Sequence, residues 1–209
     1  MLVDSHSHLF LEEFAEDLPF VMERARAAGV THIFMPNIDS TTIEPMLSVC
    51  DTYRDFCFPM IGLHPTSVNE SYEKELEIVA ANLETSGRFV AVGEIGIDLY
   101  WDKTWLKEQL IAFEKQVQWA LHYQLPIVIH CREAFDYIYK VLQPYKNSGL
   151  TGIFHSFTGT PGEAVRMMEF PGFKIGINGV VTFKKSTLPE TLKSVPLERI
   201  VLETDSPYL

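Results

Sequence analysis

The feature that most constrains the fold is a repeated alternation of short apolar segments with longer amphipathic ones. Eight short runs rich in apolar and β-branched residues predict strands at 2–4, 32–36, 57–62, 89–94, 126–130, 152–155, 173–177 and 199–203. Several of them, such as VAVG and PIVI, are apolar without interruption, which is typical of parallel strands covered on both faces. Strands separated by helices indicate βαβ units around a parallel sheet.

The segments between these runs carry apolar residues at helical spacing. One such stripe comprises Leu106, Leu110, Phe113, Val117 and Ala120, and an earlier one comprises Phe14, Leu18, Val21, Met22 and Ala25. Gly29 stands where a helix is expected to end, and Thr160 to Glu163 has the pattern of a capping box that begins another. The amphipathic segments are therefore predicted to be helices.

Eight alternating units predict an α/β fold, a (β/α)₈ TIM barrel, in a single domain over 1–209. Roughly 250 residues is typical of this fold and ~200 is its lower edge. The sequence ends just after the eighth strand, so we expect the barrel to lack its C-terminal helix. An open doubly wound sheet is the alternative, but it predicts a glycine-rich phosphate loop after the first strand. The residues there are Ser5, His6, Ser7 and His8.

Composition limits the possible partners. The 17 Lys and Arg against 28 Asp and Glu give a net charge of −11, which disfavours binding along nucleic acid or to anionic membranes. An enzyme that holds phosphate through metal ions is not excluded. No apolar run approaches the ~18 residues of a membrane span, and the first residues do not resemble a signal peptide. With three cysteines and no CxxC spacing, the expected location is cytoplasmic. No obligate protein partner is expected.

Ionisable residues follow the apolar strands at one end. The first strand leads into two histidines of an HxH pair, which would point to one face. The complete set is His6, His8, Glu94, His130, His155 and Asp205. In a barrel these strand ends converge on the face where catalytic groups lie. Polar residues often begin loops, but that explanation does not readily account for four of the seven histidines at strand ends.

A site with both nitrogen and oxygen donors suits Zn²⁺, Mn²⁺, Co²⁺ or Ni²⁺, and it suits Mg²⁺ less well. Six ligands exceed one tetrahedral site, so we expect two divalent metal ions that share a carboxylate. Glu94 is the best candidate for that bridge. Arg132 lies on the same side as His130 and is a candidate to hold phosphate, although a loop salt bridge is as good an explanation. Glu203 and Asp4 are candidates to orient ligands.

The motifs MLVDSHSHL, GLHP, VGEIGID, PIVIHCREA, FHSFTGT, INGVVTF and LETDSPYL, in this order from residue 1 to residue 209, resemble those of the TatD-type metal-dependent deoxyribonucleases. The resemblance implies an amidohydrolase-like TIM barrel that hydrolyses DNA phosphodiesters with divalent metals, often as a 3′→5′ exonuclease. It puts the metal ligands on the same six residues, and His64 at a position facing the substrate phosphate. Members of the family usually continue past the DSPYL motif to about 260 residues.

We therefore predict a metal-dependent hydrolase that acts on ester bonds, a deoxyribonuclease whose substrate is single-stranded DNA or a DNA 3′ end. Asp205 is the expected base and Glu94 the expected bridge, with His64 and Arg132 binding the substrate. RNA or a small ester is a further possible substrate. The alternatives are an amidase, lactonase or phosphotriesterase on the same barrel, and a scaffold without activity. Small-molecule hydrolases on this barrel often use a carboxylated lysine where this sequence has Glu94. The glutamate therefore favours the nuclease.

Overall fold

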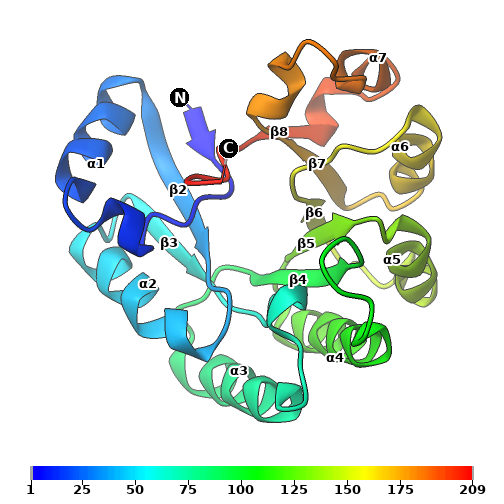
Figure 1. Ribbon diagram of the computed structural model, residues 1–209, viewed down its shortest axis with the longest axis horizontal. Coiled ribbons are helices and arrows are strands. Elements are labelled where there is room, and N and C mark those ends of the chain that lie inside the picture. The colour runs from blue at the N-terminus through cyan, green and yellow to red at the C-terminus, as the bar shows by residue number, and fades with distance from the viewer. Residues whose placement is uncertain (1, 209) are drawn as a thin grey trace.

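The computed structural model describes residues 2–208, and eight strands alternate with helices in them (Figure 1). The strands are β1 (Leu2–Asp4), β2 (Val30–Pro36), β3 (Cys57–Met60), β4 (Val92–Asp98), β5 (Ile127–Arg132), β6 (Gly152–Phe154), β7 (Phe173–Ile177) and β8 (Ile200–Leu202). The α-helices are α1 (Leu18–Ala27), α2 (Ser40–Thr52), α3 (Tyr72–Ser86), α4 (Leu106–Tyr123), α5 (Phe135–Leu142), α6 (Pro161–Met168) and α7 (Leu188–Leu192). Met1 and Leu209 lie outside the described residues, so the predicted limits 1–209 are described only from Leu2 to Tyr208.

Every pair of neighbouring strands is parallel, in the orders β1-β2-β3 and β4-β5-β6-β7-β8. A bridge between Ile61 and Val92 joins β3 to β4. The backbone N–H of Ser5, just after β1, donates to the carbonyl of Leu202 in β8 at 3.0 Å. These two links connect the sheets into the predicted barrel, with the helices outside the strands (Figure 1). Within residues 2–208 no helix follows β8, and the ring of helices is open between α7 and α1.

The fourth strand differs from the prediction. It was expected at 89–94, but β4 runs from Val92 to Asp98, so Glu94 lies inside the strand and Asp98 ends it. All seven residues of β4 are buried. The charged residue that looked like a strand end is therefore a carboxylate enclosed in the barrel. The fifth strand was expected to end at His130 but continues to Arg132, while the other strands match the prediction within about two residues at each end.

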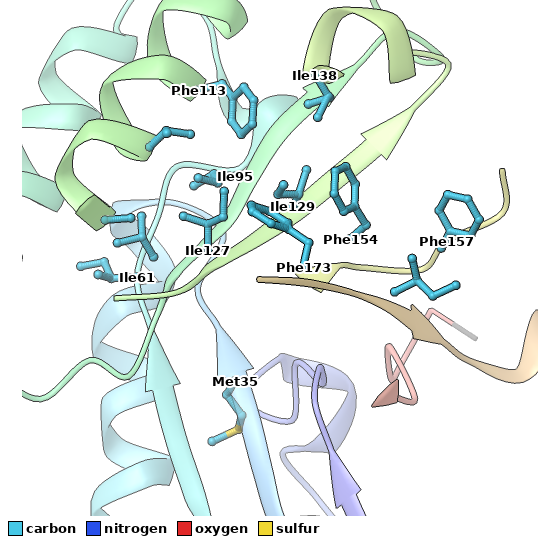
Figure 2. Packing of buried hydrophobic residues seen from close by; sticks show 14 of the residues in the cluster. Met35, Ile61, Ile95, Phe113, Ile127, Ile129, Ile138, Phe154, Phe157 and Phe173 are labelled. Atoms are coloured by element: carbon cyan, nitrogen blue, oxygen red, sulfur yellow. The ribbon is translucent and has the colours of Figure 1, made fainter. Parts of the chain in front are cut away.

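A core between barrel and helices holds the strand ends in place. Phe113, Val117 and Ala120 of α4 are fully buried, which confirms the predicted stripe, and they belong to the same cluster as Ile95 of β4. Figure 2 shows Phe113 near Ile95, with Ile129 and Phe154 of the neighbouring strands next to them. Burial of such side chains stabilises the fold by roughly 1.5–3 kcal/mol each. The packing fixes the outward face of β4 and thereby directs Glu94 inward.

The helix ends follow the sequence signals with one exception. The backbone at Gly29 is left-handed (φ 89°), directly after the end of α1, and Thr160 and Glu163 form the predicted capping box of α6. The exception is Phe14, which lies in a separate 3₁₀ turn (Glu12–Phe14) and not in α1. Among the described residues, no helix has both the length and the apolar composition needed to cross a bilayer.

Candidate metal centre

The carboxyl ends of the strands bring the predicted site residues to one face of the barrel. They are His6 and His8 after β1, His64 after β3, Glu94 in β4, His130 in β5, His155 after β6 and Asp205 after β8. The structure thus brings together all six predicted ligands and His64. Their role as metal ligands stays a prediction. The distances between their nitrogen and oxygen atoms show whether they lie close enough together to hold an ion.

The segments after β1 and β8 are held together by backbone contacts. The N–H of Asp205 donates to the carbonyl of His6 at 2.9 Å, and the N–H of His8 donates to the carbonyl of Ser206 at 2.8 Å. Asp4 accepts from the N–H of His6 and from both the N–H and the hydroxyl of Thr204. Asp4 was expected to orient the HxH pair. It contacts that pair through the backbone N–H of His6 and not through an imidazole ring.

One group of possible ligands forms around the HxH pair. The Nε2 atoms of His6 and His8 face each other at 3.1 Å. Asp205 Oδ1 lies 3.7 Å from the first and 3.6 Å from the second. Both histidine side chains are almost completely buried, at 0% and 3% exposure, whereas that of Asp205 is 14% exposed. Asp205 is therefore the member of this group with access to solvent.

A second group forms around His130. Its Nδ1 lies 2.8 Å from Glu94 Oε1, and the Nε2 of His64 lies 3.4 Å from the same oxygen. His64 Nε2 and His130 Nδ1 are 3.2 Å apart. The family resemblance implied that His64 faces the substrate phosphate. In the structure His64 is also close enough to be one ligand of a metal ion together with Glu94 and His130.

Glu94 belongs to both groups because its two oxygens face different histidines. Oε2 lies 3.1 Å from His6 Nε2, and Oε1 lies 2.8 Å from His130 Nδ1. Its side chain is only 3% exposed. A buried carboxylate directed to two clusters of nitrogen donors has the geometry of a shared ligand, in line with the expectation that Glu94 bridges two ions.

His155 lies against the first group and is backed by a second carboxylate. Its ring stacks on that of His6 with centroids 3.4 Å apart, and its Nε2 is 3.5 Å from Asp205 Oδ1. Its Nδ1 lies 3.1 Å from Glu203 Oε2. Gly176 makes room for this carboxylate, since a Cβ there would lie 2.3 Å from Glu203 Oε2. Glu203 is thus placed to orient His155, as the sequence suggested.

The donor set fits a divalent cation. Two imidazole Nε2 atoms and two carboxylate oxygens converge in a space that is almost closed to solvent. Their lone pairs would repel one another unless a proton or a cation lay between them. Mixed imidazole and carboxylate ligands suit Zn²⁺, Mn²⁺, Co²⁺ and Ni²⁺. The residues that would hold an ion are those of the first group, and a second ion would take Glu94 and His130 of the second group.

The charges around the site favour ionised carboxylates. Burial acts to raise the pKa of Glu94, but His64, His6 and His155 together hold it well below the usual value. Burial likewise acts to lower the pKa of His130, but its hydrogen bonds to Asp98 and Glu94 prevail and raise it to about 8. Burial and the neighbouring His6 lower the pKa of His8 to about 3. At neutral pH His8 therefore offers a free lone pair, as a ligand must.

Asp98 is a residue of the site that was not predicted from the sequence. Its Oδ2 accepts from His130 Nε2 at 2.8 Å, which leaves Nδ1 directed at Glu94. Such a partner sets the tautomer and orientation of a ligating histidine. A signal was present, because residues 94, 96 and 98 of one strand point to the same face. The alternation was missed because the strand was predicted to end at Glu94.

Gly96, between Glu94 and Asp98, allows β4 to approach β5 closely. It has φ 149°, and a Cβ there would lie 2.0 Å from the carbonyl oxygen of His130.

All members of the two groups except the fully buried His6 line a cavity of about 670 Å³. Arg132 lies in the cavity wall as the only Lys or Arg among the described lining residues. Its guanidinium stacks on the ring of Tyr100, with Cζ 3.9 Å from the centroid. Among the described residues no carboxylate forms an ion pair with it, so the salt-bridge explanation of Arg132 has no support here.

The fold is that of known hydrolases. The chain superposes on the crystal structure of YJJV, a TatD homologue from Escherichia coli K12, with a TM-score of 0.91 and 30% identity over 99% of this chain and 79% of that one. A TatD-family hydrolase from Entamoeba histolytica gives a TM-score of 0.84 over 98% of this chain and 73% of that one, at 24% identity, and shares the fold. Barrel and site together define a metal-dependent hydrolase.

Sequence relatives narrow this class. The model of the TatD-related DNases matches residues 3–209. The chain is 35% identical to the uncharacterized metal-dependent hydrolase YabD of Bacillus subtilis, over all of this chain and 81% of that protein. It is 30% identical to the 3′-5′ ssDNA/RNA exonuclease TatD of Pantoea ananatis, over all of this chain and 80% of that protein. The chain therefore belongs to the TatD-related DNase family.

Proposed function

We propose that this protein is a divalent-metal-dependent nuclease that hydrolyses phosphodiester bonds and shortens DNA from the 3′ end. The observation that carries the proposal is the position of Glu94, whose two oxygens face two separate groups of nitrogen donors at the wall of an open cavity. A pair of ions sharing one carboxylate is a common arrangement for phosphoryl transfer. A relative at 30% identity bears the name of a 3′-5′ ssDNA/RNA exonuclease, which supports the same substrate class.

Two ions would be held by the six predicted ligands, with Glu94 common to both: His6, His8, Glu94, His130, His155 and Asp205. When bound, such ions lower the pKa of water and neutralise charge on the phosphate. Asp98 and Glu203 orient the ligands His130 and His155 from outside.

The protein side chains have separate tasks in the hydrolysis. A bond forms between the water oxygen and phosphorus, and the bond from phosphorus to the 3′ oxygen of the preceding nucleotide breaks. That oxygen takes a proton from solvent and leaves as a 3′ hydroxyl. Asp205 accepts the proton of the water, because it is ionised and is the carboxylate of the first group with access to solvent. Arg132 binds phosphoryl oxygens from the cavity wall. His64, whose Nε2 lies 3.4 Å from Glu94 Oε1, contacts the phosphate next to these ligands.

The charge of the molecule limits how the substrate binds. With −11 overall and only Arg132 as a Lys or Arg among the described cavity residues, attraction for phosphate is confined to the metal site and that one guanidinium. Long contacts along a duplex would instead meet a negative surface. Binding is therefore short in footprint and directed to a strand end.

A side-by-side assay tests this function. The protein loaded with Mn²⁺ is given a 5′-fluorescent single-stranded DNA with a free 3′ end, the same sequence as RNA, and a panel of lactones, amides and phosphotriesters. We expect hydrolysis of DNA, with RNA as a slower or equal substrate. On the small molecules kcat/KM should be at least about a hundredfold lower, because they lack the anionic phosphoryl oxygens that Arg132 and His64 bind. Preferred turnover of a lactone or amide would instead assign the site to a small-molecule hydrolase.

A further inference from the structure

Two exposed aromatic residues and an arginine stand at the edge of the cavity. Tyr100 and Trp101 follow β4 and are 51% and 70% exposed, with ring centroids 4.9 Å apart. The guanidinium of Arg132 lies 3.9 Å from the centroid of Tyr100 and 5.5 Å from that of Trp101. These three residues are called the aromatic ledge. Trp101 and Arg132 of the ledge line the same cavity as His64, His130 and Asp205.

The ledge is attached to the metal centre through Asp98. Its Oδ1 accepts from the backbone N–H groups of Tyr100 at 2.9 Å and Trp101 at 3.3 Å, while its Oδ2 accepts from His130 Nε2. Gln109 of α4 holds the backbone of Asp98 from the other side, accepting from its N–H and donating to its carbonyl. The base of the ledge is therefore fixed, although its rings are open to solvent.

Each part of the ledge is suited to one part of a nucleotide. The ring of Trp101 offers a large apolar face, and such faces stack on bases of any identity. Arg132 is next to Asp98 on the neighbouring strand, where the two residues pair in register, and Tyr100 holds its guanidinium by a cation–π contact. A guanidinium held in this way and without an ion-pair partner among the described residues is free to bind a phosphate.

We propose that the aromatic ledge is a subsite for one unpaired nucleotide, with the base stacked on Trp101 and its phosphate bound by Arg132. The inference rests on the proposed nuclease function and adds the form of its substrate. A base in a blunt duplex end is paired and stacked on its neighbour, so it reaches Trp101 only after fraying. Single-stranded 3′ ends are therefore preferred to blunt duplex ends.

The test compares two changes that remove the same contact. Trp101→Ala removes the stacking face, and a substrate with an abasic tetrahydrofuran at the 3′-terminal position removes the base. With Mn²⁺-loaded enzyme, we expect each change alone to raise KM by about tenfold or more. The two together are expected to cost no more than one alone, and kcat is expected to change little. Trp101→Phe should recover most of the lost affinity, because phenylalanine keeps a ring.

Phe20→Ala is the matched control, since Phe20 is an exposed aromatic residue of α1 (62% exposed) outside the cavity lining, and it should behave as the parent protein. If the parent digests DNA but Trp101→Ala has the same KM, the ledge is wrong while the nuclease function stands. Equal losses of Trp101→Ala on normal and abasic substrates would also overturn the ledge. If the parent digests neither DNA nor RNA, the nuclease function fails and the ledge with it.

Discussion

Replacing Asp205 by asparagine is expected to lower kcat on single-stranded DNA by about 10²- to 10⁴-fold while most of the bound metal is retained. Asparagine keeps an oxygen for the ion but cannot accept a proton from water. Burial acts to raise the pKa of Asp205, but the hydrogen bond and charge of His155 prevail and keep the pKa below its usual value. The carboxylate is thus ionised at neutral pH. Asparagine also tolerates the left-handed backbone at this position (φ 59°), so the fold should be preserved.

Steady-state kinetics and elemental analysis of the same preparation measure the two effects of Asp205→Asn. Asp55→Asn serves as the control, because Asp55 is an exposed residue between α2 and β3, at the opposite end of the strands. Its activity and metal content should equal those of the parent. An Asp205→Asn protein that digests DNA as fast as the parent would remove Asp205 from the role of base. Loss of the metal together with activity would make it a ligand only.

Replacing Glu94 by glutamine is expected to have the largest effect on metal content. The change keeps the volume of a side chain that is 3% exposed, but it removes the negative charge that faces His6, His64 and His130. Without a carboxylate common to both groups, bound metal should fall from about two ions per chain to fewer than about one. Activity is expected to fall with it.

Thermal unfolding with and without Mn²⁺ provides a second readout for Glu94→Gln. Binding to the folded state alone stabilises a protein by about 2.7 kcal/mol at a hundredfold excess over Kd, so the parent melts at a higher temperature with metal. The variant should lose most of that shift, whereas Glu77→Gln, an exposed change in α3, should keep it. Unchanged stoichiometry and an unchanged shift in Glu94→Gln would contradict the bridge.

The sequence was informative about the barrel and about the group of residues in the site for a simple physical reason. In a parallel barrel each strand needs an apolar run, and all carboxyl ends meet at one face. His6 and His8, which follow β1, and Asp205, which follows β8, are therefore recognisable as neighbours from strand ends alone. Backbone hydrogen bonds between the two segments then place them within a few ångströms of each other.

The features that sequence reasoning missed depend on partners far along the chain. Glu94 looks like the end of a strand because charged residues usually lie at the surface. In the folded protein histidines 6, 64, 130 and 155 surround it, and β4 continues to Asp98. The pairing of Asp98 with His130 joins residues 32 positions apart. The sequence pattern does not show which charged residues will be paired with another side chain in the folded protein. Because a paired charge is able to lie inside a buried strand, the pattern alone does not show where such a strand ends.

The most direct test of the central claim is digestion of a 5′-labelled single-stranded DNA by the purified protein in Mn²⁺, in EDTA, and in EDTA followed by excess Mn²⁺. We predict a ladder of products that shorten from the 3′ end in Mn²⁺, no products in EDTA, and the ladder again when Mn²⁺ is restored. An intact substrate in Mn²⁺, or the same ladder in EDTA as in Mn²⁺, would contradict the assignment of this barrel as a metal-dependent nuclease.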